Sequence, residues 1–446
     1  MRSSLYQQVI QLAWPAVFQG LLTTIILFTD RLILGAYSDA ALASMQVSGP
    51  ILWSLFSLFG AYSIGVLALI GRAVGAEESD KVARIYGTAL CIAIVLGSLV
   101  GVTGYLLTED IATVLIGSNA DTSAAKSLAE TYLATVMLSG PILMIGSVTI
   151  IAFQASGDTK TPMWITFFSG AINLGMSWIL VFGTFGFPQL GILGAAIGTV
   201  LSHCSNALLG LLLIRYKSQI IRFARPKLKT LRSIFTISWP VFGEKLLFHS
   251  GFLFFAGLIG RLGDQAMTAH QAMIAIEALG FIAAHAFSIA AATLVAQKLG
   301  AKKPHEAHEA AIISTKLSVL VLSAIGLLFF FGAEPLLRLF TQDPAVLAIG
   351  VPCMTIAAFS QPLMALTDSF SGVLRGSGDT KTPMKVALIG PLLVRPISCY
   401  FLAFSCGYGL WGIWIGSTLD WLTRSIWLYA VFRQGKWQKI QIGADS

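Results

Sequence analysis

The chain has 446 residues, of which 56% are hydrophobic and 11% are charged. Soluble proteins carry about a quarter charged residues, so this composition excludes an ordinary soluble domain and indicates a chain whose main solvent is lipid. The net charge of +8 does not indicate a nucleic-acid partner, because the basic residues lie in short breaks between apolar runs and form no single basic face.

Apolar runs alternate with polar breaks along the whole chain, and each run is long enough to cross a hydrocarbon core of about 30 Å. In chain order, the first half predicts membrane helices at 8–36, 43–71, 85–107, 125–155, 162–185 and 190–214. The second half predicts them at 232–260, 266–297, 310–333, 343–374, 383–405 and 409–432. The expected fold class is an all-α polytopic membrane protein with twelve transmembrane helices.

Lysine and arginine are concentrated in alternate loops. With a cytoplasmic N-terminus, the inside loops hold most of them, among others Lys81, Lys160, Arg222, Lys302 and Lys381. The outside loops hold little more than Lys126, Arg261 and Arg338. Because basic residues resist translocation, this asymmetry predicts a multi-pass protein with both termini in the cytoplasm. The expected location is the bacterial cytoplasmic (inner) membrane. The first apolar run is too long for a signal-peptide core, so we expect it to stay in the protein.

An identical heptapeptide, GDTKTPM, occurs at 157–163 and again at 378–384. Trp-Pro pairs and glycine patterns repeat in the same order, which predicts two homologous halves. The expected organisation is an N-terminal six-helix lobe at 1–215, a basic cytoplasmic linker at 216–231, a C-terminal six-helix lobe at 232–432 and a cytoplasmic tail at 433–446. Since each half has an even number of spans, the repeats are parallel, and a central substrate cavity is expected between the lobes.

The heptapeptide itself is best explained as a helix–helix connection. Its glycine suits the end of one helix, and its proline suits the first turn of the next, where a missing N–H costs nothing. We expect the second threonine, Thr161 or Thr382, to cap that next helix.

Further motifs occur in a fixed order along the chain. They are Trp14-Pro15, the run from Thr29 to Gly35, Ala269-His270-Gln271, Leu374-Arg375-Gly376 and the run from Trp411 to Trp414. With the duplicated heptapeptide, they resemble the multidrug and toxic compound extrusion (MATE) family, in particular its DinF-like branch, over essentially the whole chain. The resemblance implies two pseudo-symmetric six-helix bundles and cation-driven efflux of amphiphilic, often cationic, compounds.

An ionisable residue inside a membrane helix costs at least about 2.5–3.5 kcal/mol at the bilayer centre, so it indicates a function. Asp30 lies in the outer third of the first helix, next to Leu32 and Ile33. Desolvation there favours the protonated carboxyl, which allows Asp30 to take up and release a proton during a transport cycle. The alternative is an ion pair with Arg31, but adjacent residues point about 100° apart on a helix. The MATE resemblance implies the same coupling role for Asp30.

The resemblance also implies a cation site with an acid in helix one, an asparagine and an acid in helix five, and a threonine in helix six. Asp30, Asn173 and Thr199 match this pattern and allow sodium to bind there, but Ser177 replaces the second acid. Because hard cations benefit from added carboxylate charge, this change favours a proton while leaving sodium open.

The second half has charged residues where the first half has polar ones. Glu244 replaces Gln19 and Asp368 replaces Ser147, so both acids are candidates for a second-lobe cation site, with a structural ion pair to a nearby lysine as the alternative for Glu244. A structural charge network is predicted for Arg395, Asp420 and Arg424. Candidate polar groups inside the lobes are Gln46, Gln271 and His249.

Together these features predict a secondary active exporter, an antiporter of amphiphilic, cationic drugs or metabolites driven by a proton or sodium gradient through alternating access. A flippase for an amphipathic lipid-linked metabolite is the alternative; an enzyme or a channel is less favoured, because catalytic and filter motifs are absent from the sequence. We expect no cofactor apart from the coupling ion. The expected partners are a small-molecule substrate and the bilayer, without nucleic acid, and the expected state is a monomer.

Overall fold

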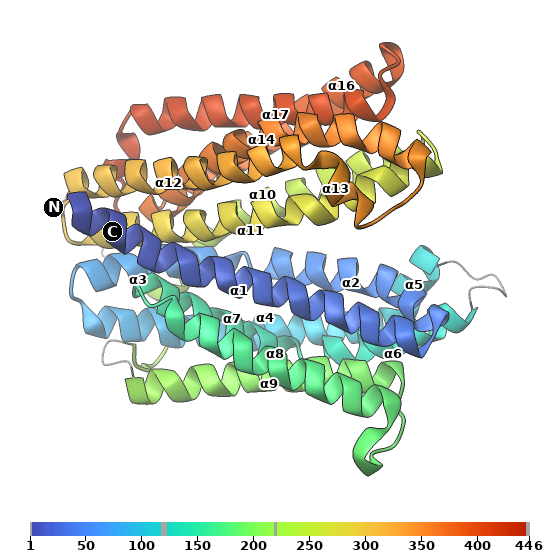
Figure 1. Ribbon diagram of the computed structural model, residues 1–446. Helices are drawn as coiled ribbons and strands as arrows, with labels where there is room; N and C mark the ends of the chain where they lie inside the picture. Colours follow the sequence, from blue (N-terminus) through green and yellow to red (C-terminus); the bar gives the residue numbers. More distant parts are fainter. Residues whose placement is uncertain (1, 117–122, 218–220, 443–446) are drawn as a thin grey trace. The chain divides into compact units, whose positions relative to one another are not determined.

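The computed structural model describes residues 2–116, 123–217 and 221–442, which form helices joined by short connections, with no β-strand among them (Figure 1). Side chains are described except at residues 2–3, 46–47, 115–116, 123 and 217. Of the described helices, ten are long and apolar enough to cross a membrane, and a bent pair gives an eleventh. A twelfth, α17, contains Asp420 and Arg424 within an otherwise apolar stretch. The predicted all-α membrane fold is confirmed.

The first half contains nine α-helices among its described residues. They are α1 (Arg2–Tyr37), α2 (Asp39–Phe59), α3 (Tyr62–Gly75), α4 (Ser79–Leu106), α5 (Thr108–Ile116), α6 (Ser123–Met137), α7 (Gly140–Ala155), α8 (Lys160–Phe182) and α9 (Ile192–Lys217). The predicted second span is broken between α2 and α3 after Phe59. The predicted fourth span is bent by 55° between α6 and α7. Pro141, in the first turn of α7, has no N–H to continue the hydrogen-bond ladder of α6, which accounts for that bend.

The second half contains eight α-helices among its described residues. They are α10 (Leu228–Gly260), α11 (Asp264–Gly300), α12 (Pro304–Phe331), α13 (Ala333–Arg338), α14 (Pro344–Ser377), α15 (Lys381–Ile389), α16 (Arg395–Tyr400) and α17 (Gly409–Arg433). The predicted span at 383–405 is a single helix with two π-helical stretches, Gly390–Val394 and Phe401–Ser405. Helices α11, α12, α14 and α17 pack side by side in this half (Figure 1).

The chain divides into two compact units. The N-terminal unit is Phe18–Val74 with Glu78–Ile234, and the C-terminal unit is Met1–Val17 with Gly75–Glu77 and Phe235–Ser446. The sequence assigned residues 1–17 to the first half, whereas the structure groups them with the second. The reason is that the first turns of α1 pack on α11 and α12, in a cluster of Leu5, Val9, Leu12, Ala13, Phe287, Ala290, Leu294, Ala310 and Ile313.

The two heptapeptides form equivalent helix connections. Gly157 and Gly378 have φ values of +90° and +97°, the left-handed conformation that glycine adopts without strain, so the predicted helix ends are confirmed. The predicted threonine caps are wrong. Asp158 accepts hydrogen bonds from the Thr161 backbone N–H at 2.9 Å and from its hydroxyl at 2.6 Å. Asp379 does the same for Thr382, at 3.0 and 2.7 Å.

Candidate functional site

Asp30 lies near the end of α1 and is only 5% exposed. Asn173 faces it from α8. With its amide nitrogen toward Asp30, Asn173 donates to both carboxylate oxygens, at 3.0 Å to Oδ1 and 3.2 Å to Oδ2. In the reversed orientation the amide oxygen would face the carboxylate, and two acceptors would meet. The orientation with the amide nitrogen toward Asp30 therefore fits an ionised Asp30.

Three hydroxyl groups complete the surroundings of this pair. The Thr199 hydroxyl, on α9, lies 3.4 Å from the other terminal amide atom of Asn173 and 3.3 Å from the Tyr132 hydroxyl on α6. Ser177, four residues after Asn173 on α8, is fully buried beside the Asp30 carboxyl. We call Asp30, Tyr132, Asn173, Ser177 and Thr199 the Asp30 cluster. It contains one acid, no base and several neutral oxygen atoms.

Close packing of α8 and α9 brings the cluster together. Asn173 and Ser177 lie on the same face of α8, since four residues make about one helical turn. Gly198 of α9 sits directly against the backbone and hydroxyl of Ser177, so close that a Cβ there would clash. Small residues of this kind allow membrane helices to approach, and here the approach places Thr199 beside Asn173.

The predicted members Asp30, Asn173, Ser177 and Thr199 therefore lie together, and Tyr132 was missed. Its only sequence signal is a phenol in an apolar run, whose buried hydroxyl needs a hydrogen-bond partner. Arg31 is exposed, and among the described side chains no ion pair joins it to Asp30. The carboxyl of Asp30 is thus surrounded by neutral groups.

The candidate acids of the second half, Glu244 and Asp368, lie among basic side chains of the C-terminal unit. Glu244 on α10 forms a short ion pair with Arg375 on α14, and each side chain is 14% exposed. Asp368, also on α14, interacts electrostatically with Arg375, Arg424 and Lys245. Because basic groups already surround the two acids, this region is a poor site for an additional cation.

The Glu244–Arg375 pair has a neutral counterpart in the first half. Gln19, the equivalent of Glu244, accepts a hydrogen bond from Gln154 at 3.3 Å. Gln154 and Arg375 stand in the same position before the two heptapeptides. The second half therefore replaces an amide pair by an ion pair, which explains why acid and base occur together.

Two of the remaining polar candidates, Gln271 and His249, belong to the C-terminal unit. Gln271 is exposed on α11, and its amide contacts the Met267 sulfur at 3.8 Å. His249 is half-buried on α10 and packs edge-on against Phe248. Gln46 belongs to α2, but its side chain is outside the described residues.

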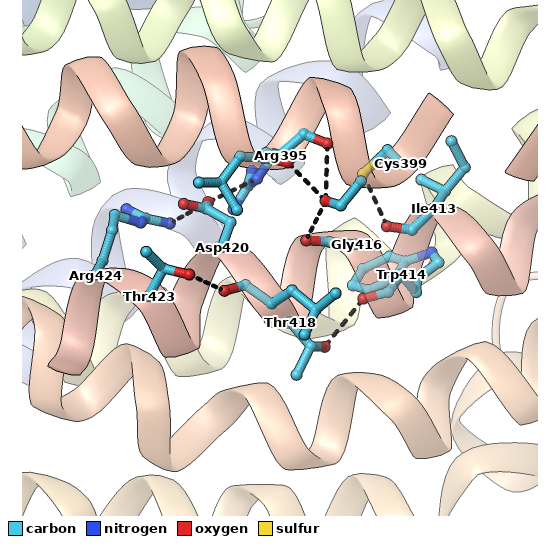
Figure 2. Close-up of polar contacts among 12 residues, drawn as sticks. Arg395, Cys399, Ile413, Trp414, Gly416, Thr418, Asp420, Thr423 and Arg424 are labelled. Carbon is cyan, nitrogen blue, oxygen red and sulfur yellow. Dashed lines mark hydrogen bonds and ion pairs between the residues drawn. The ribbon is translucent and has the colours of Figure 1, made fainter. Parts of the chain in front are cut away.

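The predicted charge network of α16 and α17 is confirmed. Asp420 lies between Arg395 and Arg424 and accepts from Arg395 Nε at 2.9 Å and from an Arg424 terminal nitrogen at 2.8 Å (Figure 2). The Arg424 guanidinium also stacks over the Trp421 ring, 3.8 Å from its centroid. Sequence reasoning missed Glu277 on α11, which is 4% exposed, accepts from Gln361 at 3.5 Å and interacts electrostatically with Arg395. The sequence feature that could have identified Glu277 is an acidic residue within the apolar run at 266–297.

The MatE family profile matches two stretches of this sequence, residues 15–179 and 240–401, one in each half. The chain belongs to the MatE family. The predicted family and transporter class are confirmed, while the DinF-like branch stays a prediction. The two matches also follow the predicted duplication, since each begins at the proline of a Trp-Pro pair.

Proteins similar to this MatE chain extend over its full length. A "Probable multidrug resistance protein NorM" from Thermotoga maritima is 29% identical over 443 residues, covering 97% of this chain and 93% of the relative. A protein of the same name from Burkholderia pseudomallei is 27% identical, covering 91% and 88%.

Among solved structures, a MOP superfamily transporter from Pyrococcus furiosus is 16% identical, with a TM-score of 0.90 over 98% of this chain and 97% of that one. A multidrug resistance MATE family transporter described in an outward-facing conformation has the same TM-score of 0.90 and the same identity of 16%, and covers 98% of this chain and 97% of its own. These two structures support the fold.

Proposed function

We propose that this MatE transporter is an antiporter that exports amphiphilic, cationic drugs or metabolites and is coupled to an ion gradient through Asp30. The observation that carries the proposal is a buried carboxyl that has only neutral groups around it among the side chains that the structure describes. Holding a charge there is costly, and no fixed base offsets that cost within the Asp30 cluster. Binding of a proton or a sodium ion therefore changes the free energy of the N-terminal unit substantially, and this change can drive alternating access.

The Asn173 amide gives this site two states. When Asp30 is ionised, the amide nitrogen points to it and donates to both carboxylate oxygens, as the distances of 3.0 and 3.2 Å allow. When Asp30 is protonated, the amide can turn its oxygen toward the carboxyl and accept a hydrogen bond from the carboxyl O–H. Rotation of Asn173 thus links the ionisation of Asp30 to the contacts of Thr199 on α9.

The donor set favours a proton over sodium as the coupling ion. A sodium ion would require Asn173 to turn its oxygen inward and would find a single carboxylate, since Ser177 supplies only a hydroxyl. The oxygen atoms of Thr199 and Tyr132 are close enough to add neutral ligands. Sodium coupling is therefore the second candidate, with Asp30, Asn173 and Thr199 as ligands.

Several features support an exporter in the bacterial cytoplasmic membrane. The relatives from Thermotoga and Burkholderia carry names that describe multidrug resistance. The asymmetric distribution of lysine and arginine supports cytoplasmic termini. A flippase for lipid-linked metabolites is less favoured, because the Asp30 cluster is acidic and an anionic headgroup would be repelled by it.

Transport of a fluorescent cationic dye into proteoliposomes tests the proposal, with proton and sodium gradients imposed separately. Dye should accumulate under the proton gradient in the native protein and fail to accumulate in Asp30→Asn. Ser177→Asp restores a second acid and should add a response to sodium. Accumulation by Asp30→Asn equal to that of the native protein would refute the coupling role.

A further inference from the structure

The two halves place different residues at the position of Asp30. The Trp-Pro pairs of α1 and α10 are 225 positions apart, and so are Asp39 and Asp264, the first residues of α2 and α11. Both anchors give the same offset, and between them the helices align without insertion. Phe255 on α10 is therefore the equivalent of Asp30.

The helices that follow the heptapeptides align through their contacts with α9 and α17. Gly198 lies against Ser177, and in the second half Gly416 lies in the same way against Cys399. Ser177 and Cys399 are therefore equivalent, at an offset of 222. The two stretches that match the family profile end at 179 and 401, which gives the same offset.

A π-helical turn explains the change of register within this helix. The heptapeptides themselves are 221 positions apart, one fewer than the contacts with α9 and α17. The π-helical stretch Gly390–Val394 takes up the additional residue, because its turns are wider than those of an α-helix. Immediately after it, the offset of 222 makes Arg395 the equivalent of Asn173.

Asp30 and Asn173 are in contact in the first half, and their equivalents Phe255 and Arg395 are in contact in the second. In the N-terminal unit, the Asn173 amide donates to Asp30. In the C-terminal unit, the Arg395 guanidinium carbon lies 5.4 Å from the centroid of the Phe255 ring. The equivalent positions are thus in contact in both halves. The second half has an aromatic ring, Phe255, in place of the acid and a cation, Arg395, in place of the amide.

The groups around Arg395 would suit a bound cation. Asp420 accepts from its Nε at 2.9 Å and from Arg424 at 2.8 Å, and the guanidinium carbon of Arg395 lies over the rings of Phe255 and Trp421, 5.4 and 5.8 Å from their centroids. Glu277 supplies a second carboxyl group in electrostatic range of Arg395, so two acids accompany the two arginines. Carboxylates and aromatic faces are the groups that hold planar cations, and the Arg395 side chain is only 12% exposed among them.

We propose that Arg395 is a permanent internal cation that fills, in the second half, the place equivalent to the ion site of the first. The C-terminal unit then binds no coupling ion, and each transporter has a single ion-coupling site. The single-site conclusion rests on the function proposed for Asp30. The cation seat itself, formed by Phe255, Glu277, Asp420 and Trp421, rests only on contacts within the C-terminal unit.

The proposal is tested by removing the Arg395 side chain and adding small cations to the purified protein. Arg395→Ala is made in the Asp30→Asn background, so that no response can come from the Asp30 cluster, and the melting temperature of the purified full chain is measured in detergent. Millimolar guanidinium or sodium should each raise it by several degrees in a saturable way, whereas the Asp30→Asn parent should show no saturable shift. Arg395→Lys should behave as the parent, because the ammonium group stays in the seat.

Arg375→Ala in the same background is the matched control. Arg375 is equally buried and paired with an acid, but its equivalent is Gln154, and Lys245 remains nearby to neutralise the cluster. It should gain no response to sodium. If Arg395→Ala does not fold, the same melting-temperature shifts are measured with Arg395→Gln, and the same results are expected. Absence of a saturable shift in the Arg395 variant, or an equal sodium shift in Arg375→Ala, would overturn the cation seat. Failure of Asp30→Asn to abolish dye transport would instead count against the proposed function and the single-site conclusion, and would not affect the cation seat.

Discussion

Replacement of Asp420 by asparagine should strongly destabilise the C-terminal unit. Asp420 is fully buried, and one of its oxygens accepts from both Arg395 and Arg424, at 2.9 and 2.8 Å. Asparagine keeps the size but removes the charge, which leaves two guanidinium groups facing each other in a region of low dielectric. Removing one partner of a buried ion pair costs about 3–5 kcal/mol, and the cost of Asp420→Asn should lie in that range.

The matched control for Asp420→Asn is Glu334→Gln. Glu334 pairs with Arg338 at the same distance of 2.8 Å, but the two side chains are 56% and 49% exposed. Exposed pairs contribute about 0.2–1 kcal/mol because water screens them. Reversible unfolding in mixed micelles measures both variants. Equal losses of stability in the two would refute the reasoning, since burial would then not determine the strength of the interaction.

Three further substitutions follow from the contacts described above. Glu244→Gln alone should lower the free energy of unfolding by about 3–5 kcal/mol. The double variant Glu244→Gln, Arg375→Gln should recover most of this loss in the same micelle assay, because two glutamines recreate the amide pair of the first half. Tyr132→Phe removes one hydrogen-bond partner of the Thr199 hydroxyl and should lower the free energy of unfolding by about 0.5–1.5 kcal/mol, with a several-fold loss of proton-driven dye transport. Gly198→Val would push α9 away from α8 and should cost about 1–3 kcal/mol, together with loss of transport.

Each of these substitutions has an outcome that would contradict its reasoning. A double glutamine variant less stable than Glu244→Gln would show that the ion pair and the amide pair are not interchangeable. Transport by Tyr132→Phe at the native rate would remove Tyr132 from the Asp30 cluster. A Gly198→Val protein with native stability and transport would show that α8 and α9 have more room than the contact of Gly198 with Ser177 indicates.

The sequence predicted the fold because the membrane imposes strong and regular patterns on it. Twenty or so apolar residues are needed for each span, and the duplicated heptapeptide divides the chain in two. Helical breaks were missed where hydropathy continues through them, as between α6 and α7, since a bend alters geometry without altering composition. The packing of residues 1–17 on the second half was missed for a similar reason, because α1 is a single continuous helix whose residues are divided between the two units.

The Asp30 cluster was partly predictable. An acid in an apolar helix is conspicuous on energetic grounds, and the four-residue spacing of Asn173 and Ser177 places them on one face. Tyr132 and Glu277 became visible only in three dimensions, because their significance lies in contacts between helices that are distant in sequence. The cap formed by Asp158 was assigned to Thr161 instead, since both residue types cap helices and composition alone does not separate them.

The coupling role of Asp30 is tested most directly by counting the protons released when a cationic dye binds to the purified protein in weakly buffered detergent solution. The native protein should release protons on binding, and Asp30→Asn should release none while remaining folded. Asp368→Asn, which changes a membrane acid in the other unit, should release as many protons as the native protein. Undiminished release by Asp30→Asn would contradict the account.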